Sequence, residues 1–155
     1  RIPVIEDEGL VLWESNAIVR HLALKHDEGG LCPRDPAVRA DADRWMEWCT
    51  ATLTPPMTTL FLGLVRTAPE KRDAKAIEQA RVGMEALVGI LDARLATRAY
   101  IVGADFSMGD IPLGVFVHRW YTLPIDRPAA PYVEAWHGRL CGRAAFRQHV
   151  LMTAA

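Results

Sequence analysis

The first part of the chain changes from strand-like to helical spacing of its apolar residues over a short distance. A β-branched run with a proline near its start occupies residues 2–5, where a strand tolerates the missing N–H. A polar turn ending in Gly9 follows, and residues 10–12 form an apolar return segment. From Glu14 the apolar spacing becomes helical, with Ser15 at the N-cap position. The pattern predicts a β-hairpin and then a helix docked on a sheet.

The next helix is predicted to begin at Asp35, with the aspartate as its N-cap and Pro36 in its first turn. Apolar residues at spacings of three and four then indicate one buried face. The members of this face are Val38, Ala42, Trp45, Cys49 and Leu53. Pro55 and Pro56 are expected to kink or end the helix, because each removes a donor and clashes with the preceding turn.

Four further helices are predicted in the second half of the chain. Apolar residues from 74 to 95 recur at spacings of three and four. Ser107 and Asp110 form a capping box, in which the serine hydroxyl bonds the Asp110 amide and the aspartate returns to the serine amide. A helix beginning at Pro131 and a short terminal helix follow. The larger part of the chain is therefore expected to be helical.

The junction between the predicted hairpin and helix suits a ligand with both charges of an amino acid. A helix N-terminus offers unpaired N–H groups and the positive end of the helix dipole, so a carboxylate binds there readily. Ser15 can add its hydroxyl, and Glu14 can hold an ammonium group. If the Ile2–Pro3 bond is cis, the N–H and C=O of Ile2 turn outward and can pair with a peptide ligand as a short added strand.

Composition excludes several classes of function. The 155 residues are half hydrophobic and 24% charged with a net charge of −1, which is neither disordered nor basic enough to indicate nucleic acid or an anionic membrane. No apolar run is long enough for a transmembrane helix, and no signal peptide is visible. The three cysteines are odd in number and far apart, as in a cytoplasmic protein with reduced thiols. Neither they nor the five histidines are spaced as metal ligands.

These elements, in their order, resemble the glutathione transferase family in its bacterial, theta- or beta-like forms. The family motif of strand, cis-proline, strand, Glu-Ser and helix is matched by residues 2–4, 10–12 and 14–18. The family's helical-domain signature, Ser/Thr-x-Ala-Asp, is matched by residues 107–110, with Gly109 in place of alanine. The resemblance extends over the whole chain, because the last helices also fit the family's closing pattern.

The resemblance implies an α+β fold class, with the C-terminal part of a thioredoxin-like domain followed by an all-helical bundle domain. The implied boundaries are 1–27 for the β-hairpin and helix, 28–35 for the linker and 36–155 for the helical domain. Two short strands do not form a stable sheet alone. We therefore expect that a preceding β-α-β unit of roughly fifty residues is absent from this sequence.

The resemblance also implies an enzyme that conjugates the thiolate of glutathione, its co-substrate, to a small hydrophobic electrophile. Glutathione would be bound by Glu14, Ser15, the Ile2 backbone and Pro3, with Arg1 near its glycyl carboxylate. The family supplies its thiol-activating serine, tyrosine or cysteine upstream of the position of Arg1. No catalytic residue is therefore named in this chain.

A homodimer is implied as well. Asp43 and Glu47 are candidates to reach the γ-glutamyl ammonium of glutathione bound by the other subunit, and Trp45, Thr50 and Thr54 are candidates on the electrophile side. No metal, nucleic acid or membrane partner is expected.

Three alternative functions stay open. A non-catalytic binding or assembly module shares the fold, and a glutathione-dependent disulfide reductase, isomerase or dehalogenase would differ upstream of this chain. A free-standing helical interaction domain is disfavoured, because the strand edges of its hairpin would be exposed.

Overall fold

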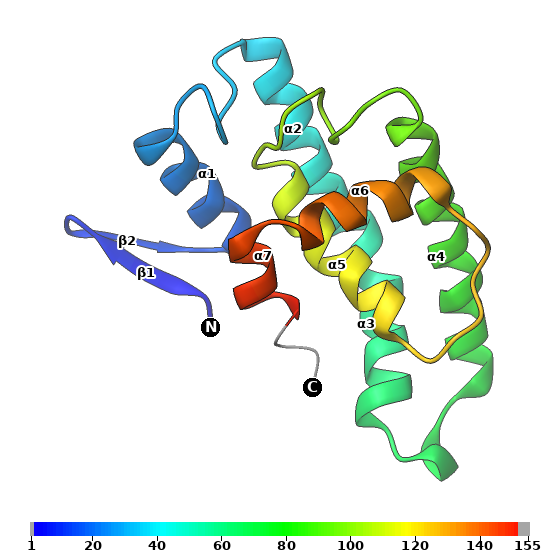
Figure 1. Cartoon of the computed structure of the whole chain (residues 1–155). Helices are drawn as coiled ribbons and strands as arrows, with labels where there is room; N and C mark the ends of the chain where they lie inside the picture. The colour runs from blue at the N-terminus through cyan, green and yellow to red at the C-terminus, as the bar shows by residue number, and fades with distance from the viewer. Residues whose placement is uncertain (1, 152–155) are drawn as a thin grey trace.

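The computed structural model describes residues 2–151, in which a two-stranded hairpin precedes a larger helical body (Figure 1). Strands β1 (Val4–Asp7) and β2 (Leu10–Trp13) pair antiparallel, with Val4 opposite Trp13 and Asp7 opposite Leu10. Both central turn residues, Glu8 and Gly9, have positive φ angles of 52° and 86°. Such a turn matches the right-handed twist of the flanking strands, so the predicted hairpin is confirmed.

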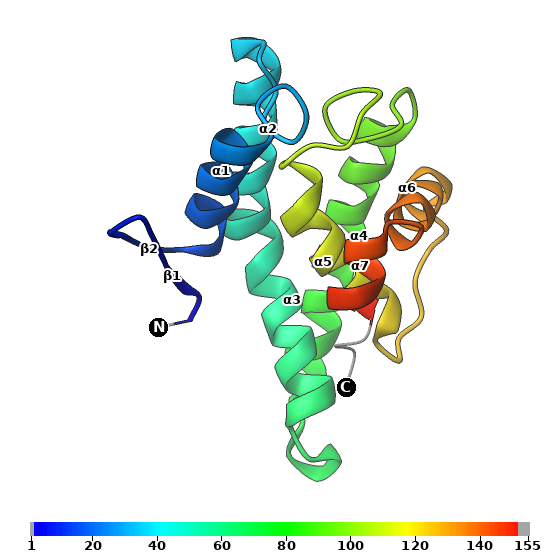
Figure 2. The same cartoon turned by 60° about the vertical axis from the view of Figure 1, so that its left-hand side comes forward.

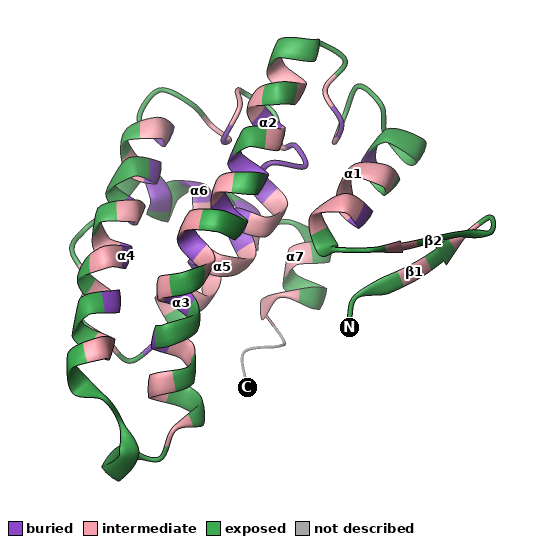
Figure 3. Cartoon of the chain, turned by 180° about the vertical axis from the view of Figure 1, so that it is seen from behind, coloured by how far each residue is buried: buried purple, intermediate pink, exposed green. Residues whose placement is uncertain are grey.

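Helix α1 (Ser15–His26) follows the hairpin and is bonded to its turn by charged groups. The Asp7 carboxylate lies 2.6 Å from Nε2 of His21 and accepts a hydrogen bond of 2.8 Å from Nζ of Lys25. Lys25 first, and then His21, lower the pKa of Asp7. The hairpin therefore leans on α1 through polar contacts, while apolar side chains on its strands stay largely exposed (Figure 3).

A long helical run follows the linker. Asp35 caps helix α2 (Pro36–Trp48) by accepting bonds from Ala37 N and Val38 N, as predicted. The π-helical turn η1 (Cys49–Leu53), helix α3 (Thr54–Phe61) and the π-helical turn η2 (Leu62–Arg66) continue it without a loop (Figure 2).

The double proline follows the end of helix α2, one of the two predicted outcomes, but no loop separates α2 from α3. The α-helical bonding pattern does stop before the prolines, at Trp48, but the chain stays helical through η1 and into α3. Pro55 and Pro56 then lie in the first turn of α3, where a missing N–H costs little. The π-helical turn thus accommodates both prolines inside one continuous run.

The remaining helices surround α5 (Asp110–Thr122), which lies at the centre of the body in both views (Figures 1 and 2). After the short 3-10 helix η3 (Pro69–Lys71), α4 (Ala74–Leu95) packs on α3 and on α6 (Pro131–Cys141). Helix α7 (Ala144–His149) closes the chain against α6. These helices confirm the predicted periodicity, because their apolar faces form the core. Its largest fully buried side chains include Trp120, Trp136, Met46, Leu53, Met57, Leu60, Met84, Leu91, Leu113 and Leu140.

A buried carboxylate, that of Asp110, joins three parts of this body. Its Oδ1 accepts bonds from Ile101 N at 2.9 Å and from Nε1 of Trp136 at 2.8 Å. Its Oδ2 accepts bonds from Ser107 N at 3.0 Å and from the Ser107 hydroxyl at 3.1 Å. Burial raises the pKa of Asp110, and the four donated bonds oppose that rise. The carboxylate thereby holds the 100–107 loop, the start of α5 and helix α6 together.

The predicted capping box is correct in one half and wrong in the other. Asp110 does return to the Ser107 amide, but the Ser107 hydroxyl bonds the carboxylate rather than the Asp110 amide, which donates to Ser107 O at 3.0 Å. Gly109, the departure from alanine, also has a structural reason. A Cβ at this position would lie 3.2 Å from the Cα of Ala42, so an alanine here would require α2 and this turn to move apart by a few tenths of an ångström.

Two histidines stack inside the helical body. Nδ1 of His118 on α5 lies 3.3 Å from Nε2 of His137 on α6, with the rings 5.4 Å apart and 16° from parallel. Burial lowers the pKa of both imidazoles, and the His118 charge adds to the lowering at His137. The pair therefore fits its site when it is neutral, as expected for packing histidines.

Removing the Asp110 carboxylate is expected to destabilise the protein strongly. Asp110→Ala leaves buried donors without an acceptor, so we expect a loss of about 3–5 kcal/mol in the free energy of unfolding. Ser107→Ala removes one of the four bonds and should cost about 1 kcal/mol. Urea unfolding measures both variants. Asp105→Ala, at an exposed carboxylate of the same loop, is the control, and an Asp110→Ala loss no larger than the control's would contradict this role.

Stability is expected to fall as the pH decreases from about 7 to 5. Because the pKa of each stacked imidazole is below its ordinary value, the unfolded chain binds more protons than the folded chain over this range. Urea unfolding at several pH values measures the slope, and a variant with glutamine at both His118 and His137 should show a shallower one. An unchanged slope would mean that other groups cause the pH dependence.

Candidate functional site

The junction between β2 and α1 leaves two polar side chains without partners. Glu14 occupies the N-cap position of α1, and its carbonyl accepts the first helical bond, from Ile18 N at 3.0 Å. Both Glu14 and Ser15 are exposed, and within residues 2–151 neither side chain makes a hydrogen bond or ion pair. A carboxylate, a hydroxyl and the first free N–H groups of a helix are therefore open to a ligand.

The prediction that Ser15 caps α1 is wrong by one residue. Ser15 is the first residue inside the helix, and Glu14 takes the cap with φ of 69° and ψ of 118°. A residue with a side chain rarely adopts a positive φ, and such residues gather at binding sites. Because Ser15 is not used as a cap, its hydroxyl remains available to a ligand.

The second half of the predicted motif lies beside the first. The Ile2–Pro3 peptide bond is cis, as the sequence analysis considered, and the Ile2 side chain is 98% exposed. Val4 pairs with Trp13 across the hairpin, so residues 2–3 and 14–15 leave it at the same end, opposite the turn (Figure 1). Arg1, placed near the ligand in the sequence analysis, lies outside the described residues.

Asn16, which the sequence analysis did not single out, bonds this junction to the helical body. Its Nδ2 donates to Met46 O at 3.0 Å and to Oγ1 of Thr50 at 3.0 Å. Because of the second bond, Thr50, which was predicted on the electrophile side, lies next to the start of α1. Its side chain is exposed there. The Thr54 hydroxyl, farther along the same helical run, donates to Cys49 O at 2.9 Å.

A second contact between the two parts uses the predicted subunit-contact residues. Arg20 on α1 bonds the Asp43 carboxylate at 2.6 Å and forms an ion pair with Glu47, both on α2. These carboxylates hold α1 against α2 within one chain. Their proposed reach to a ligand in another subunit stays a prediction.

Trp45, the third predicted electrophile-side residue, faces the core. Only 9% of it is exposed, its ring meets Trp48 edge to face at 5.2 Å, and the Arg94 guanidinium lies 5.5 Å from its centre. Its indole N–H is buried and finds no hydrogen-bond acceptor among residues 2–151. Trp45 therefore packs between α2 and α4 and does not line the open junction.

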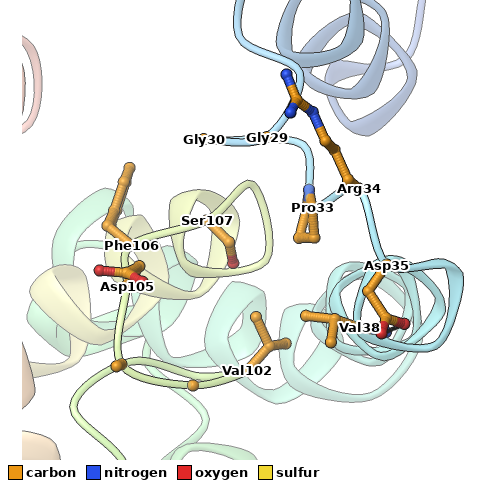
Figure 4. A pocket seen from close by; sticks show the side chains of 12 residues that line it. Gly29, Gly30, Pro33, Arg34, Asp35, Val38, Val102, Asp105, Phe106 and Ser107 are labelled. Carbon is orange, nitrogen blue, oxygen red and sulfur yellow. Dashed lines mark hydrogen bonds between the residues drawn. The ribbon is translucent and has the colours of Figure 1, made fainter.

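A pocket of about 300 Å³ lies elsewhere, between the linker and the loop before α5 (Figure 4). Val38 and Val102 face each other across it, and Arg34 borders it. Helix α1 has 12 residues, a length of about 18 Å, and the pocket is at the end of α1 opposite Ser15. It does not include any residue of the junction. Its lining residues are Gly29, Gly30, Pro33, Arg34, Asp35, Val38, Val102, Gly103, Ala104, Asp105, Phe106 and Ser107.

The described residues offer neither a metal centre nor a membrane-spanning helix. Residues 2–151 contain no group of three or more His, Cys, Asp or Glu side chains placed to hold a metal ion. Within the same residues, no helix has both the length and the apolar character needed to cross a membrane. The junction at Glu14 and Ser15 is therefore the strongest candidate for ligand binding.

Comparisons with known proteins agree with the motif. Residues 1–24 match the model of the glutathione S-transferase N-terminal domain, and residues 74–139 match that of its C-terminal domain. Glutathione S-transferase GstB of Escherichia coli is 37% identical over 153 residues, which cover 97% of this chain and 74% of GstB. Disulfide-bond oxidoreductase YfcG of the same bacterium is 31% identical, with coverage of 97% and 72%.

Solved structures extend the agreement to three dimensions. The theta class glutathione S-transferase from Xanthomonas axonopodis pv. citri superposes in its apo form with a TM-score of 0.96 and 43% identity, covering 100% of this chain and 81% of that one. The glutathione-bound form superposes with a TM-score of 0.94 and 44% identity, covering 99% and 80%. The fold class is therefore confirmed as a thioredoxin-like part followed by a helical domain, and this chain belongs to the glutathione S-transferase family.

Proposed function

We propose that this protein is a glutathione transferase that binds glutathione at the junction between β2 and α1. The observation that carries the proposal is the pair of exposed, unpartnered side chains of Glu14 and Ser15 at the start of α1. They stand beside the exposed Ile2 and its cis bond to Pro3. Membership in the family, with a glutathione-bound relative of the same fold, supports this choice of ligand.

We assign a binding partner at the junction to each part of the glutathione tripeptide. The γ-glutamyl carboxylate would accept bonds from the first N–H groups of α1 and from the Ser15 hydroxyl. The γ-glutamyl ammonium would pair with the Glu14 carboxylate. The cysteinyl backbone would bond the N–H and C=O of Ile2 as a short antiparallel strand, with Pro3 setting its direction and Arg1 near the glycyl carboxylate.

Catalysis would follow from placing the thiolate against an electrophile. The thiolate sulfur forms a bond to the electrophilic carbon, and the leaving group departs with the electron pair of the bond that breaks. We assign no thiol-activating residue within this chain. Thr50 and Thr54 are proposed to border the electrophile, since both lie on the helical run that Asn16 holds against the junction.

Several broader properties belong to the same proposal. We divide the chain into 1–27 for the thioredoxin-like part, 28–35 for the linker and 36–155 for the helical domain. A homodimer in which Asp43 and Glu47 approach the ammonium in the other subunit is proposed, with glutathione and a hydrophobic electrophile as ligands. A cytoplasmic location is supported by the three free cysteines.

The main alternative is a glutathione-dependent disulfide reductase. The 31% identity to the disulfide-bond oxidoreductase YfcG supports this alternative. Such an enzyme reduces a disulfide either with the thiol of bound glutathione or with a reactive cysteine of its own. Cys32 and Cys49 are buried, and burial raises the pKa of Cys49 to about 12 and also raises that of Cys141. None of these thiols belongs to the junction. The transferase is favoured because GstB, at 37% identity, and the theta class structures, at 43% and 44%, are more similar to this chain than YfcG. A non-catalytic module would have no need for the free Glu14 and Ser15 pair.

Substitution at the junction is expected to weaken glutathione binding. Ser15→Ala removes a bond to a charged group and should raise the Kd about tenfold, and Glu14→Ala with Ser15→Ala should raise it further. Calorimetric titration measures the Kd. Glu6→Ala, at an exposed and unpartnered carboxylate on β1, is the matched control and should leave the Kd within about twofold. A double variant that also stays within twofold would favour the non-catalytic module.

A further inference from the structure

Three arginine side chains in the described part of the chain make neither an ion pair nor a hydrogen bond, and two of them meet on one aromatic ring. These three are Arg66, Arg119 and Arg143. The Arg119 guanidinium carbon lies 4.7 Å from the centre of the Phe61 ring, and that of Arg66 lies 5.6 Å from the same centre. Arg119 also lies 6.0 Å from the centre of Phe116.

The two segments that meet at this pair carry no carboxylate, and the acidic residue nearest to Arg66 in sequence is Glu70, four residues after it. Phe61 ends α3, Arg66 ends η2, and Arg119 lies on α5. Neither residues 48–69 nor residues 111–125, the two segments that meet here, contain an aspartate or a glutamate. Aromatic faces attract each guanidinium, but two like charges on one ring also repel each other. An anion from outside the chain would relieve this repulsion.

Phe61 and Arg66 lie on the same helical run as Thr50, and Arg119 reaches the Phe61 ring from α5. Asn16 bonds Thr50, and Phe61 lies eleven residues after Thr50, about 16 Å farther along the helical axis. Because the thiol lies near the middle of an extended tripeptide of on the order of 10 Å, an electrophile joined to it must itself continue along the helical run to reach Phe61. In Figures 1 and 2 the start of β1 is level with α3, which agrees with this direction.

We propose that Arg119, with Arg66 beside it, binds the anionic group of an aromatic electrophile whose ring packs on Phe61 and Phe116. The inference rests on the proposed transferase function and specifies its substrate class as an electrophile that carries a carboxylate or sulfonate. Arg119 determines specificity and does not take part in bond making. In the reaction the glutathione sulfur bonds the ring carbon, the carbon–halogen bond breaks, and halide leaves with the electron pair.

The first test is equilibrium binding, which needs no catalysis. Fluorescence titration compares 8-anilino-1-naphthalenesulfonate with N-phenyl-1-naphthylamine, which lacks the sulfonate. Arg119→Met keeps an apolar side chain and removes the charge, and should weaken binding of the sulfonate about tenfold while leaving the neutral probe within about twofold. Arg143→Met is the matched control, because Arg143 also lies on an aromatic ring, 3.7 Å from the centre of Phe106, without other partners.

Two further variants keep the test decisive if Arg119→Met does not fold. Arg119→Lys keeps the charge and should retain more of the selectivity for the sulfonate than Arg119→Met. Arg66→Met changes an exposed side chain and should weaken binding of the sulfonate about threefold. Equal weakening of both probes in these variants, or no weakening of either, would overturn the proposal.

The second test links the anion to turnover. The kcat/KM for 4-chloro-3,5-dinitrobenzoate should fall about tenfold in Arg119→Met, while that for its methyl ester should stay within about twofold. Glutathione binding is measured on the same samples. If glutathione does not bind but Arg119→Met still discriminates between the two probes, the transferase function fails and the anion site stands. If glutathione binds and neither the probes nor the substrate pair are discriminated, the anion site fails and the transferase function stands.

Discussion

The helical body depends on one buried carboxylate, that of Asp110. An ionised group without partners is costly to bury, and here four donors from the 100–107 loop and α6 surround it. These bonds fix where α5 begins, and Gly109 beside it lets α2 approach to van der Waals contact. Since α5 carries Phe116 and Arg119, the same carboxylate also determines where the proposed anion site lies. A structural residue thus positions a functional surface at the other end of its helix.

Helix α1 is joined to the body both by a small apolar cluster, in which Ala23 packs with Ala42 and Met46 of α2, and by polar side chains. Asn16 and Arg20 of α1 bond the carbonyl of Met46, the hydroxyl of Thr50 and the two carboxylates of Asp43 and Glu47 on the long helical run. Directional bonds of this kind fix the orientation of a helix as well as its distance. The start of α1, where we propose that glutathione binds, is consequently held in a fixed position relative to Thr50 on the helical run.

Local patterns in the sequence predicted most of the elements, because they depend on neighbours along the chain. The apolar periodicity of 74–95, the Asp35 cap and the junction of strand, Glu14-Ser15 and helix all rest on such contacts. The exceptions arise where a local rule has two solutions. A double proline can break a helix, or it can follow a π-helical turn inside a continuous helical run. The N-cap of α1 can be Ser15, or it can be Glu14 if Glu14 adopts a positive φ.

The family, the fold class and the candidate junction can be predicted from consecutive residues, because these carry the ordered motifs and the periodic apolar faces. The packing of Trp45 in the core, the bonds of Asn16 and Arg20 across the two parts and the sharing of the Phe61 ring by Arg66 and Arg119 become visible only once the helices are packed together. The physical reason is that a side chain's partners across helices depend on how those helices pack, and residues far apart in sequence carry no local sign of their meeting.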